Sequence, residues 1–273
     1  MKTGEPTEPK GGEHAVPPTF TPGEPLLTCE QLVIGYGDKP MLPPIDMVIR
    51  RGQFVAVVGR NGSGKSTWFK TLLGMIEPVS GTIRRASPAM RSAYVPQSSA
   101  IDSLLPLRAR ELTAWGRLRG WSFLWPFSRK VDRDAVESAL ETAGAKAIAP
   151  RQYRELSEGQ KQRTLLARLI ATEADLVLLD EPTAAMDAVA ERETMQRLCA
   201  LARKRGLGVV VVVHDLEVAA EHADILFFVD RETSAFVVGD ARTVFCHPAF
   251  RRQYGDEYCQ RAPEGPHRGN DAR

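Results

Sequence analysis

Short apolar runs separated by turn residues dominate the chain from about residue 26 onward. Leu27–Ile34 and Ile45–Arg50 are separated by the turn signal Gly37-Asp38, and Arg51-Gly52 precedes a third run, Phe54–Val58. Segments rich in apolar and β-branched residues and bounded by such turns are typical of strands. We therefore expect an antiparallel sheet that leads into the glycine-rich segment after Phe54–Val58.

The pattern changes to helical periodicity in the middle of the chain. Short strands are predicted at Gly81–Arg85 and Ser92–Val95, but strand signals are absent from Ser98 to Arg154. Within that stretch, Ala109–Arg119 and Val131–Ala143 repeat apolar residues at the spacing of a helix face. We expect a helical subdomain, at about residues 98–172, inserted into the rest of the domain.

Wholly apolar runs return in the last third of the chain. Leu176–Leu179 and Val209–Val213 lack polar alternation, which is typical of parallel strands buried on both faces, and a long helix is expected between them at about residues 188–205. Ile225–Val229 and Ala235–Val238 predict a closing hairpin. The whole pattern predicts an α/β fold with a mostly parallel sheet, an N-terminal antiparallel β-subdomain and an inserted α-helical subdomain.

The two ends of the chain differ from this core. Residues 1–25 combine prolines, glycines and charges with few large apolar side chains, so they cannot bury enough surface to offset the entropy of ordering. We expect a disordered leader over residues 1–25, one folded unit over residues 26–245, and a C-terminal helix with a polar tail over residues 246–273. We expect no signal peptide, because the leader lacks an apolar segment, and no membrane span, which needs ~20 apolar residues.

Composition and charge narrow the possible partners. The chain has 273 residues, 43% of them apolar, and a formal net charge of +2. Because Lys and Arg are scattered as well as nearly balanced by acids, we expect no nucleic acid partner. The four cysteines, Cys29, Cys199, Cys246 and Cys259, form no C-x-x-C pair, so we expect reduced thiols in a cytosolic protein. A metal site at Cys246, His247 and Cys259 is an alternative, but it lacks a fourth ligand.

The glycine-rich segment after Phe54–Val58 matches the phosphate-loop pattern G-x-x-x-x-G-K-[ST] at every specified position. Glycines let the backbone turn so that N–H groups point at anionic oxygens, and the helix expected from Trp68 to Met75 adds its dipole. Lys65 can reach between the β- and γ-phosphates, and the Ser66 hydroxyl can ligate Mg²⁺. The sequence therefore predicts a nucleoside triphosphate site formed by Gly59, Arg60, Asn61, Gly62, Ser63, Gly64, Lys65, Ser66 and Thr67.

Polar residues follow three of the predicted strands. Asp180 and Glu181 come directly after one apolar strand, His214 comes after the next, and Gln97 follows an earlier one. Open parallel sheets hold ligands at the carboxyl ends of their strands, so we expect these side chains near the phosphate loop. Asp180 and Gln97 are candidate Mg²⁺ contacts, Glu181 is placed to polarise the attacking water, and His214 is placed to contact the γ-phosphate. For Gln97, a loop glutamine in solvent is the alternative.

Two further positions suit a nucleotide. Ser157 can cap the helix that follows it, and the free N–H groups at such a helix start suit a second anion. Tyr36 lies in the first turn, where its ring can either stack on adenine or pack on its own sheet. The sequence leaves both alternatives for Tyr36 open.

In this order, the motifs resemble the nucleotide-binding subunit of an ABC transporter. The resemblance covers roughly Leu26 to Gly239 and includes the phosphate loop, the signature Leu156-Ser157-Glu158-Gly159-Gln160 and the strand that ends in Asp180-Glu181. It implies a P-loop ATPase that uses ATP and Mg²⁺ to energise transport. The catalytic residues implied are Lys65, Gln97, Glu181 and His214, and the nucleotide contacts beyond the phosphate loop are Tyr36, Ser157, Gly159, Gln160 and Asp187.

The resemblance also implies partners. In this family two copies sandwich two ATP molecules, so a homodimer is expected in which Ser157 and Gly159 contact the γ-phosphate bound by the other copy. Closure would drive integral membrane permease subunits between two states, which implies a peripheral location on the cytoplasmic face of the plasma membrane. Two positions depart from the family pattern: Glu158 stands where glycine is common, and Ala184-Ala185-Met186-Asp187 replaces the usual run. Because Glu158 can point away from the site, we expect activity to survive.

Cargo can be inferred only through kinship. Tyr94-Val95-Pro96-Gln97, Ile101-Asp102 and Trp115-Gly116-Arg117 resemble subunits of bacterial zinc- and manganese-type importers, and less closely those that import iron chelates. An extracytoplasmic metal-binding protein would then be a further partner. The aromatic connector, residues 120–130, is either a partner-docking patch or the small core of the helical subdomain. A soluble ABC protein acting on ribosomes or DNA, and a cassette that binds ATP only to regulate a partner, are the alternatives to a transporter subunit.

Overall fold

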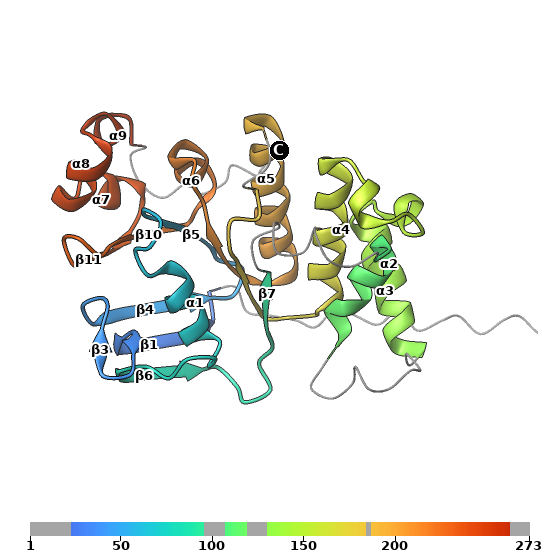
Figure 1. Ribbon diagram of the computed structural model, residues 1–273, viewed down its shortest axis with the longest axis horizontal. Coiled ribbons are helices and arrows are strands. Elements are labelled where there is room, and N and C mark those ends of the chain that lie inside the picture. The colour runs from blue at the N-terminus through green and yellow to red at the C-terminus, as the bar shows by residue number, and fades with distance from the viewer. Residues whose placement is uncertain (1–22, 96–106, 119–129, 184–186, 263–273) are drawn as a thin grey trace, which may run out of the picture.

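The main sheet is the framework of the molecule. Figure 1 shows the computed structural model, which describes residues 23–95, 107–118, 130–183 and 187–262. Within these residues the sheet contains, in spatial order, β11 (Ala235–Gly239), β10 (Ile225–Asp230), β5 (Phe54–Val58), β9 (Gly208–Val212), β8 (Leu176–Leu179) and β7 (Ser92–Val95). All neighbouring strands are parallel except β10 and β11, which form the expected hairpin. The carboxyl ends of β5, β9, β8 and β7 therefore lie at one edge.

A second, antiparallel sheet lies against the first. In the described residues it contains β4 (Ile45–Arg50), β1 (Pro25–Val33) and β6 (Ser80–Arg85), and a short hairpin of β2 (Gly35–Tyr36) and β3 (Lys39–Pro40) follows β1. The position of β5 in the sequence suggested that it joins this antiparallel sheet, but the structure places β5 in the main sheet. All five of its residues are buried, whereas β4 alternates buried and exposed positions, so β5 needs cover on both faces.

Helices and the antiparallel sheet cover the two faces of the main sheet. On one side Phe54, Ala56 and Val58 pack in a core that includes α5 (Ala188–Arg205) and α6 (Leu216–His222). On the other side Val55 and Val57 pack in a core that includes the antiparallel sheet and α1 (Lys65–Leu72). α1 begins at Lys65, three residues earlier than expected, and thus directly inside the phosphate loop.

Three helices form a separate unit at the right of Figure 1. These are α2 (Ala109–Ala114), α3 (Lys130–Thr142) and α4 (Glu158–Ala171), which pack on one another, with a 3₁₀ turn at Trp115–Arg117 after α2. We call them the helical unit. The expectation of a helical insertion is confirmed, although Gln97 and residues 120–129 of the aromatic connector lie outside the described residues.

The chain closes with three short helices beside the hairpin. α7 (Ala241–Phe245), α8 (Pro248–Tyr254) and α9 (Glu257–Arg261) gather at the upper left of Figure 1. Phe250 of α8 packs on Phe228 of β10 with ring centroids 5.2 Å apart, so these helices share the core of the main sheet. In the part of the chain described, no helix is long and apolar enough to cross a membrane.

Candidate functional site

The phosphate loop connects β5 to α1 and turns through three glycines with positive φ. These are Gly59 (φ 151°), Gly62 (φ 81°) and Gly64 (φ 105°), a region of backbone conformation that other residues rarely adopt. At Gly59 there is a second constraint, because a Cβ there would lie 2.3 Å from the carbonyl oxygen of Val229. The first turn of the loop therefore runs directly against the backbone of β10.

Lys65 holds the loop in shape. Its Nζ donates hydrogen bonds to the carbonyl oxygens of Gly59 at 2.7 Å and Arg60 at 2.8 Å, and the residue is 6% exposed. Burial lowers the pKa of this ammonium, while the charges of Glu181 and Asp180 act in the opposite direction. The buried hydroxyl of Ser63 has no hydrogen-bond partner among the described residues. The loop thus offers a concentrated positive charge and an unused polar group.

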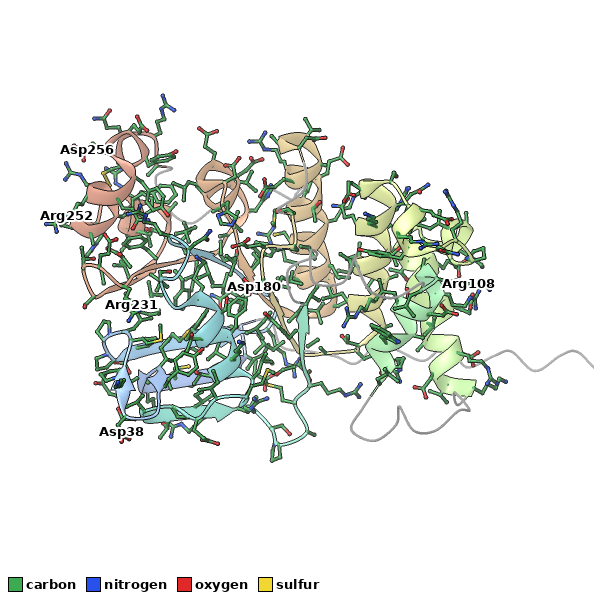
Figure 2. All side chains as sticks on the ribbon, in the orientation of Figure 1. Asp38, Arg108, Asp180, Arg231, Arg252 and Asp256 are labelled. Atoms are coloured by element: carbon green, nitrogen blue, oxygen red, sulfur yellow. A yellow bond between two sulfur atoms is a disulfide. The ribbon has the colours of Figure 1, made fainter. Side chains whose placement is uncertain are left out.

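Asp180 links the phosphate loop to the neighbouring strands. Its Oδ2 accepts hydrogen bonds from Ser66 Oγ at 3.0 Å and from the Tyr94 hydroxyl at 3.1 Å. Figure 2 shows Asp180 near the middle of the molecule. Burial, and then the Asp180 charge, raise the pKa of Tyr94 to about 12, so the phenol stays protonated and can donate. The pairing of a hydroxyl with a carboxylate provides the hard oxygen ligands that Mg²⁺ prefers.

Tyr94 is a site residue that sequence reasoning missed as such. It lies on β7 and pairs with Leu178 of the parallel strand β8. Leu178 is two positions before Asp180 in the sequence. The alternation of a strand places residues 178 and 180 on the same face, so the pairing of β7 with β8 brings the phenol within reach of the carboxylate. The order of strands in the sheet was the missing signal.

Glu181 and His214 meet at the ends of adjacent strands. His214 Nε2 lies 2.8 Å from Glu181 Oε1, and the Glu181 side chain is 15% exposed against 50% for His214. Glu181 has a φ of 48°, an unusual conformation for a residue with a side chain. Strain of this kind is maintained only where surrounding structure enforces it, and it is common at working sites. The geometry presents one nearly buried carboxylate beside the phosphate loop.

Tyr36 is exposed beside the start of α1. Its hydroxyl lies 3.3 Å from Thr67 Oγ1, and 55% of the residue is exposed. A ring packed in its own sheet would be covered, so the structure favours a ring available to a ligand over a ring that serves the local core.

Ser157 begins α4, and its charged neighbour is neutralised. The Ser157 backbone N–H donates to Gln160 Oε1 at 3.1 Å, as in a capping box, and Glu158 forms an ion pair with Lys161 at 3.0 Å. The carboxylate of Glu158 is therefore matched by a cation from its own helix. Figure 1 shows α4 on the far side of β7 and α5 from α1. The structure thus brings Asp180, Glu181 and His214 to the phosphate loop but leaves the serine-capped helix apart from it.

Asp187 caps α5. Its carboxylate accepts a hydrogen bond from the Ala190 N–H at 2.9 Å and is exposed to solvent. The three residues before it, 184–186, where the sequence departs from the family pattern, lie outside the described residues.

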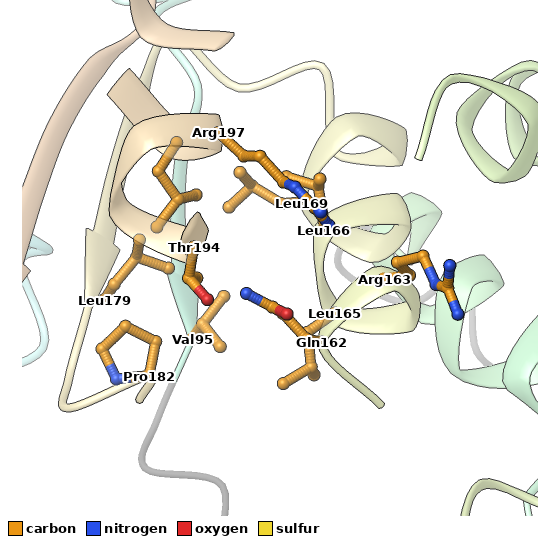
Figure 3. A pocket seen from close by; sticks show the side chains of 11 residues that line it. Val95, Gln162, Arg163, Leu165, Leu166, Leu169, Leu179, Pro182, Thr194 and Arg197 are labelled. Carbon is orange, nitrogen blue, oxygen red and sulfur yellow. The ribbon is translucent and has the colours of Figure 1, made fainter. Parts of the chain in front are cut away.

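An apolar cavity of about 40 Å³ separates part of α4 from α5. Figure 3 shows leucines of α4 and Leu179 of β8 around it, with the Gln162 amide directed inward. The Nε2 of Gln162 is buried and has no hydrogen-bond partner among the described residues. The seam between the helical unit and the main sheet is therefore incompletely packed.

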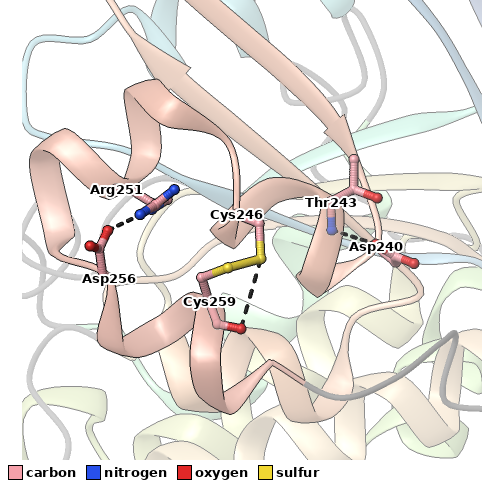
Figure 4. Close-up of a disulfide and its surroundings, with 6 residues drawn as sticks. All are labelled: Asp240, Thr243, Cys246, Arg251, Asp256 and Cys259. Atoms are coloured by element: carbon pink, nitrogen blue, oxygen red, sulfur yellow. Dashed lines mark hydrogen bonds and ion pairs between the residues drawn. A yellow bond between two sulfur atoms is a disulfide. The ribbon is translucent and has the colours of Figure 1, made fainter.

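Two of the four cysteines are not free thiols, which corrects the expectation from the sequence. Cys246 and Cys259 form a disulfide between the end of α7 and α9 (Figure 4). α8 folds back between them, so residues 13 apart in sequence have Cα atoms 4.7 Å apart, which spacing alone could not reveal. Cys29 and Cys199 are free and buried, and burial raises the pKa of Cys29 to about 12.

The disulfide also removes the alternative of a metal site at the same cysteines. Metal binding needs thiolates, and the two sulfurs are bonded to each other. His247 instead caps α8, where its Nδ1 accepts a hydrogen bond from the Ala249 N–H at 3.2 Å. Within the described part of the chain, no cluster of three or more His, Cys, Asp or Glu side chains is arranged to hold a metal ion.

Comparison with known proteins agrees with this geometry. Residues 42–184 match the protein family described as ABC transporter. The manganese transport system ATP-binding protein MntB of Bacillus subtilis (strain 168) is 33% identical over 231 residues, which cover 83% of this chain and 91% of that protein. The zinc import ATP-binding protein ZnuC of Paramagnetospirillum magneticum (strain ATCC 700264 / AMB-1) is 32% identical over 230 residues, covering 84% of this chain and 82% of that protein.

A solved structure is similar throughout the fold. It is described as a metal-chelate type ABC transporter in an inward-facing conformation, and it superposes with a TM-score of 0.71 at 27% identity. The match covers 81% of this chain and 85% of the other. The two sheets, the helical unit and the phosphate loop described above are therefore features of a known architecture.

Proposed function

Because this chain belongs to the ABC transporter ATP-binding family and is an ATPase of that family, we propose that two copies bind two MgATP molecules between them to drive a metal-ion importer. One observation carries the proposal of a shared site. The helix capped by Ser157 has a start suited to an anion, yet it stands on the far side of β7 and α5 from α1. A phosphate bound by a second copy would accept hydrogen bonds from the free N–H groups at this helix start. In this arrangement Ser157, Gly159 and Gln160 contact the ATP held by the partner's phosphate loop.

The phosphate loop itself fits a nucleotide. The Ser63 hydroxyl, which has no hydrogen-bond partner in the described part of the chain, would bind phosphate oxygens together with the loop N–H groups. Lys65 would exchange its two carbonyl contacts for the phosphates. Tyr36, half exposed beside Thr67, would stack on the adenine. Asp187, at the start of α5, would complete the nucleotide site from the loop that precedes that helix.

Oxygen atoms suited to Mg²⁺ come from two elements. Ser66 and Asp180 share a hydrogen bond of 3.0 Å, and these are the residues that would hold the ion, with Gln97 as a further ligand. Bound Mg²⁺ neutralises charge on the phosphate oxygens. Tyr94 orients the Asp180 carboxylate from β7.

Glu181 would act on the attacking water. Its carboxylate is nearly buried, fixed in an unusual backbone conformation and hydrogen-bonded to His214 at 2.8 Å. A carboxylate oriented in this way can accept the water's proton as the bond from the water oxygen to the γ-phosphorus forms and the bond from that phosphorus to the departing ADP oxygen breaks. His214 would hold that carboxylate in place and contact the γ-phosphate, which couples the two strand ends to the state of the nucleotide.

Cargo and partners follow from kinship. Two relatives are named for manganese transport and zinc import, and both align with most of this chain. We therefore favour a permease for one of these ions, together with an extracytoplasmic metal-binding protein, and a peripheral position on the cytoplasmic face of the plasma membrane. Metal chelate is the second candidate cargo, because the solved neighbour is described as a metal-chelate type transporter.

The experiment is a comparison of wild type with Glu181→Gln. The variant should bind ATP with wild-type affinity but hydrolyse it at least about a hundredfold more slowly, as expected when a catalytic base is removed. Because the bound ATP then persists, light scattering should detect a dimer with ATP and a monomer without it. A variant that hydrolyses ATP at the wild-type rate, or that stays monomeric with ATP even alongside its permease, would refute the corresponding half of the proposal.

A further inference from the structure

A chain of ion pairs connects the helical unit to the main sheet at the amino end of β8. Glu173 lies in the short segment between α4 and β8, and its Oε2 accepts hydrogen bonds from two arginines. Arg117 approaches from the helical unit at 2.7 Å and Arg91 from the sheet side at 3.0 Å. One carboxylate oxygen thus adds a polar link to the apolar core that the helical unit shares with the main sheet.

Arg117 is firmly part of the helical unit. Its guanidinium, 10% exposed, also donates to Asp132 of α3 at 2.9 Å and to the Ala171 carbonyl oxygen at the end of α4 at 3.1 Å. The preceding residue, Gly116, lies so close to α4 that a Cβ would be 2.5 Å from the Arg168 carbonyl oxygen. Arg117 therefore moves with the helical unit as one body.

Arg91 is connected to both the main sheet and the antiparallel sheet. Its backbone N–H donates to Asp175 Oδ2 at 2.9 Å, just before β8, and the other oxygen of Asp175 accepts from Arg51 at 3.0 Å. Arg51 in turn pairs with Glu24 at the start of the antiparallel sheet at 3.4 Å. Glu173 is thus the point at which a network anchored in both sheets reaches the helical unit.

The backbone at this point is also distinctive. Glu173 has a φ of 48°, in the left-handed region, and follows directly on the C-terminal end of α4. Near the other side of the same helix, the cavity of about 40 Å³ between α4 and α5 leaves the apolar contact incomplete. Apolar side chains of α4 still pack with the main sheet and α5 in one core, so the polar link at the end of α4 adds to packing that the cavity interrupts locally.

The length of α4 converts a small change at this link into a large one at Ser157. α4 has 14 residues, so at 1.5 Å per residue it is about 21 Å long. A rotation of about 5° around its C-terminal end would move Ser157 by about 2 Å, several times the ~0.5 Å tolerance of a working site.

We propose that Glu173, held between Arg117 and Arg91, is a positioning residue that sets the angle of α4 and hence the place of Ser157 relative to the phosphate loop. The consequence at ATP rests on the shared site proposed above, whereas the angle itself is a property of a single chain. Ion pairs at half-exposed carboxylates contribute little to stability, so we expect an effect on geometry without a comparable effect on folding.

The test measures the angle directly. Spin labels on Ser138→Cys in α3 and Thr82→Cys in β6, both exposed, report the distance between the helical unit and the antiparallel sheet. The two native free cysteines are buried, so they should not take the label. Glu173→Gln should broaden the distance distribution at least about twofold, because a neutral amide holds two guanidiniums more weakly than a carboxylate does.

A matched control separates the link from ion pairs in general. Glu137→Gln removes a pair with Arg110 that joins α3 to α2 inside the helical unit, and it should leave the distribution unchanged. Glu173→Gln should also keep the affinity of the phosphate loop for ATP within about twofold, while weakening ATP-dependent dimer formation in a Glu181→Gln background at least about tenfold. Arg91→Gln, which breaks the link from the sheet side, should behave like Glu173→Gln.

The outcomes are distinguishable. An unchanged distribution in Glu173→Gln and Arg91→Gln would overturn the proposal, as would equal broadening in Glu137→Gln. Glu173→Gln and Arg91→Gln could broaden the distribution even if the Glu181→Gln protein forms no dimer with ATP. In that case the positioning role stands and the shared ATP site is refuted.

Discussion

Gly59→Ala offers a stringent test of how the phosphate loop is seated. The added Cβ would lie 2.3 Å from the Val229 carbonyl oxygen and 3.1 Å from Ser63 Oγ, and the residue has a φ of 151°. Val229 is on β10, which is paired on both sides by β5 and β11, so its carbonyl cannot retreat. The loop must therefore move by about 1 Å, the scale at which a misplaced site loses about a hundredfold in function.

The cost to folding can be estimated from the same contacts. Overpacking and a disfavoured backbone conformation each cost about 1–3 kcal/mol, giving about 2–6 kcal/mol in all. At about 2–4 °C per kcal/mol for a chain of this size, the Tm should fall by about 4–24 °C. Thermal unfolding without nucleotide measures this loss of folding stability, and titration calorimetry with ATP measures the loss of affinity for ATP.

Gly62→Ala is the matched control for this variant. Gly62 lies in the same loop with a φ of 81°, but a Cβ there would meet nothing within 4 Å. It should therefore cost only the conformational part of about 1–3 kcal/mol. Equal Tm shifts for the two variants would mean that the contact with β10 is unimportant and would refute the reasoning.

Other predictions follow from single contacts. Tyr94→Phe removes the hydrogen bond to Asp180, so steady-state assays should show kcat/KM for ATP about 3–10-fold lower, and an unchanged value would exclude Tyr94 from the site. Dithiothreitol, or Cys246→Ser with Cys259→Ser, should destabilise the C-terminal helices by about 3 kcal/mol because the disulfide spans 13 residues. Cys199→Ser, which keeps the disulfide, should respond to reductant as wild type does, whereas the double variant should not respond. Burial opposes ionisation of Glu173, but hydrogen bonds from Arg117 and Arg91 prevail and lower its pKa. A lowered carboxyl pKa contributes stability above the unfolded value of 4.5 that is lost as pH falls through the lower folded pKa. Urea titrations should therefore show a small loss of stability below pH 4.5 in wild type that Glu173→Gln lacks.

The sequence by itself determined much of this protein. The phosphate loop, the acids at Asp180-Glu181 and the histidine at 214 were identifiable because glycines, carboxylates and apolar strands stand at fixed short spacings. The helical insertion and the long helix α5 were likewise predicted by their periodicity. These features are local, since each depends on residues within about one turn or one strand, and local patterns are visible along the chain.

Tertiary structure alone decided which distant residues meet. The order of strands brought Tyr94 to Asp180, placed β5 in the main sheet and left the serine-capped helix apart from the phosphate loop. The fold of α7–α9 joined Cys246 to Cys259, and the turn after α4 placed Glu173 between two arginines. None of these contacts has a fixed spacing in the sequence, because each arises when separate elements bury their apolar faces against one another, and the polar groups at their ends then take the partners that packing provides.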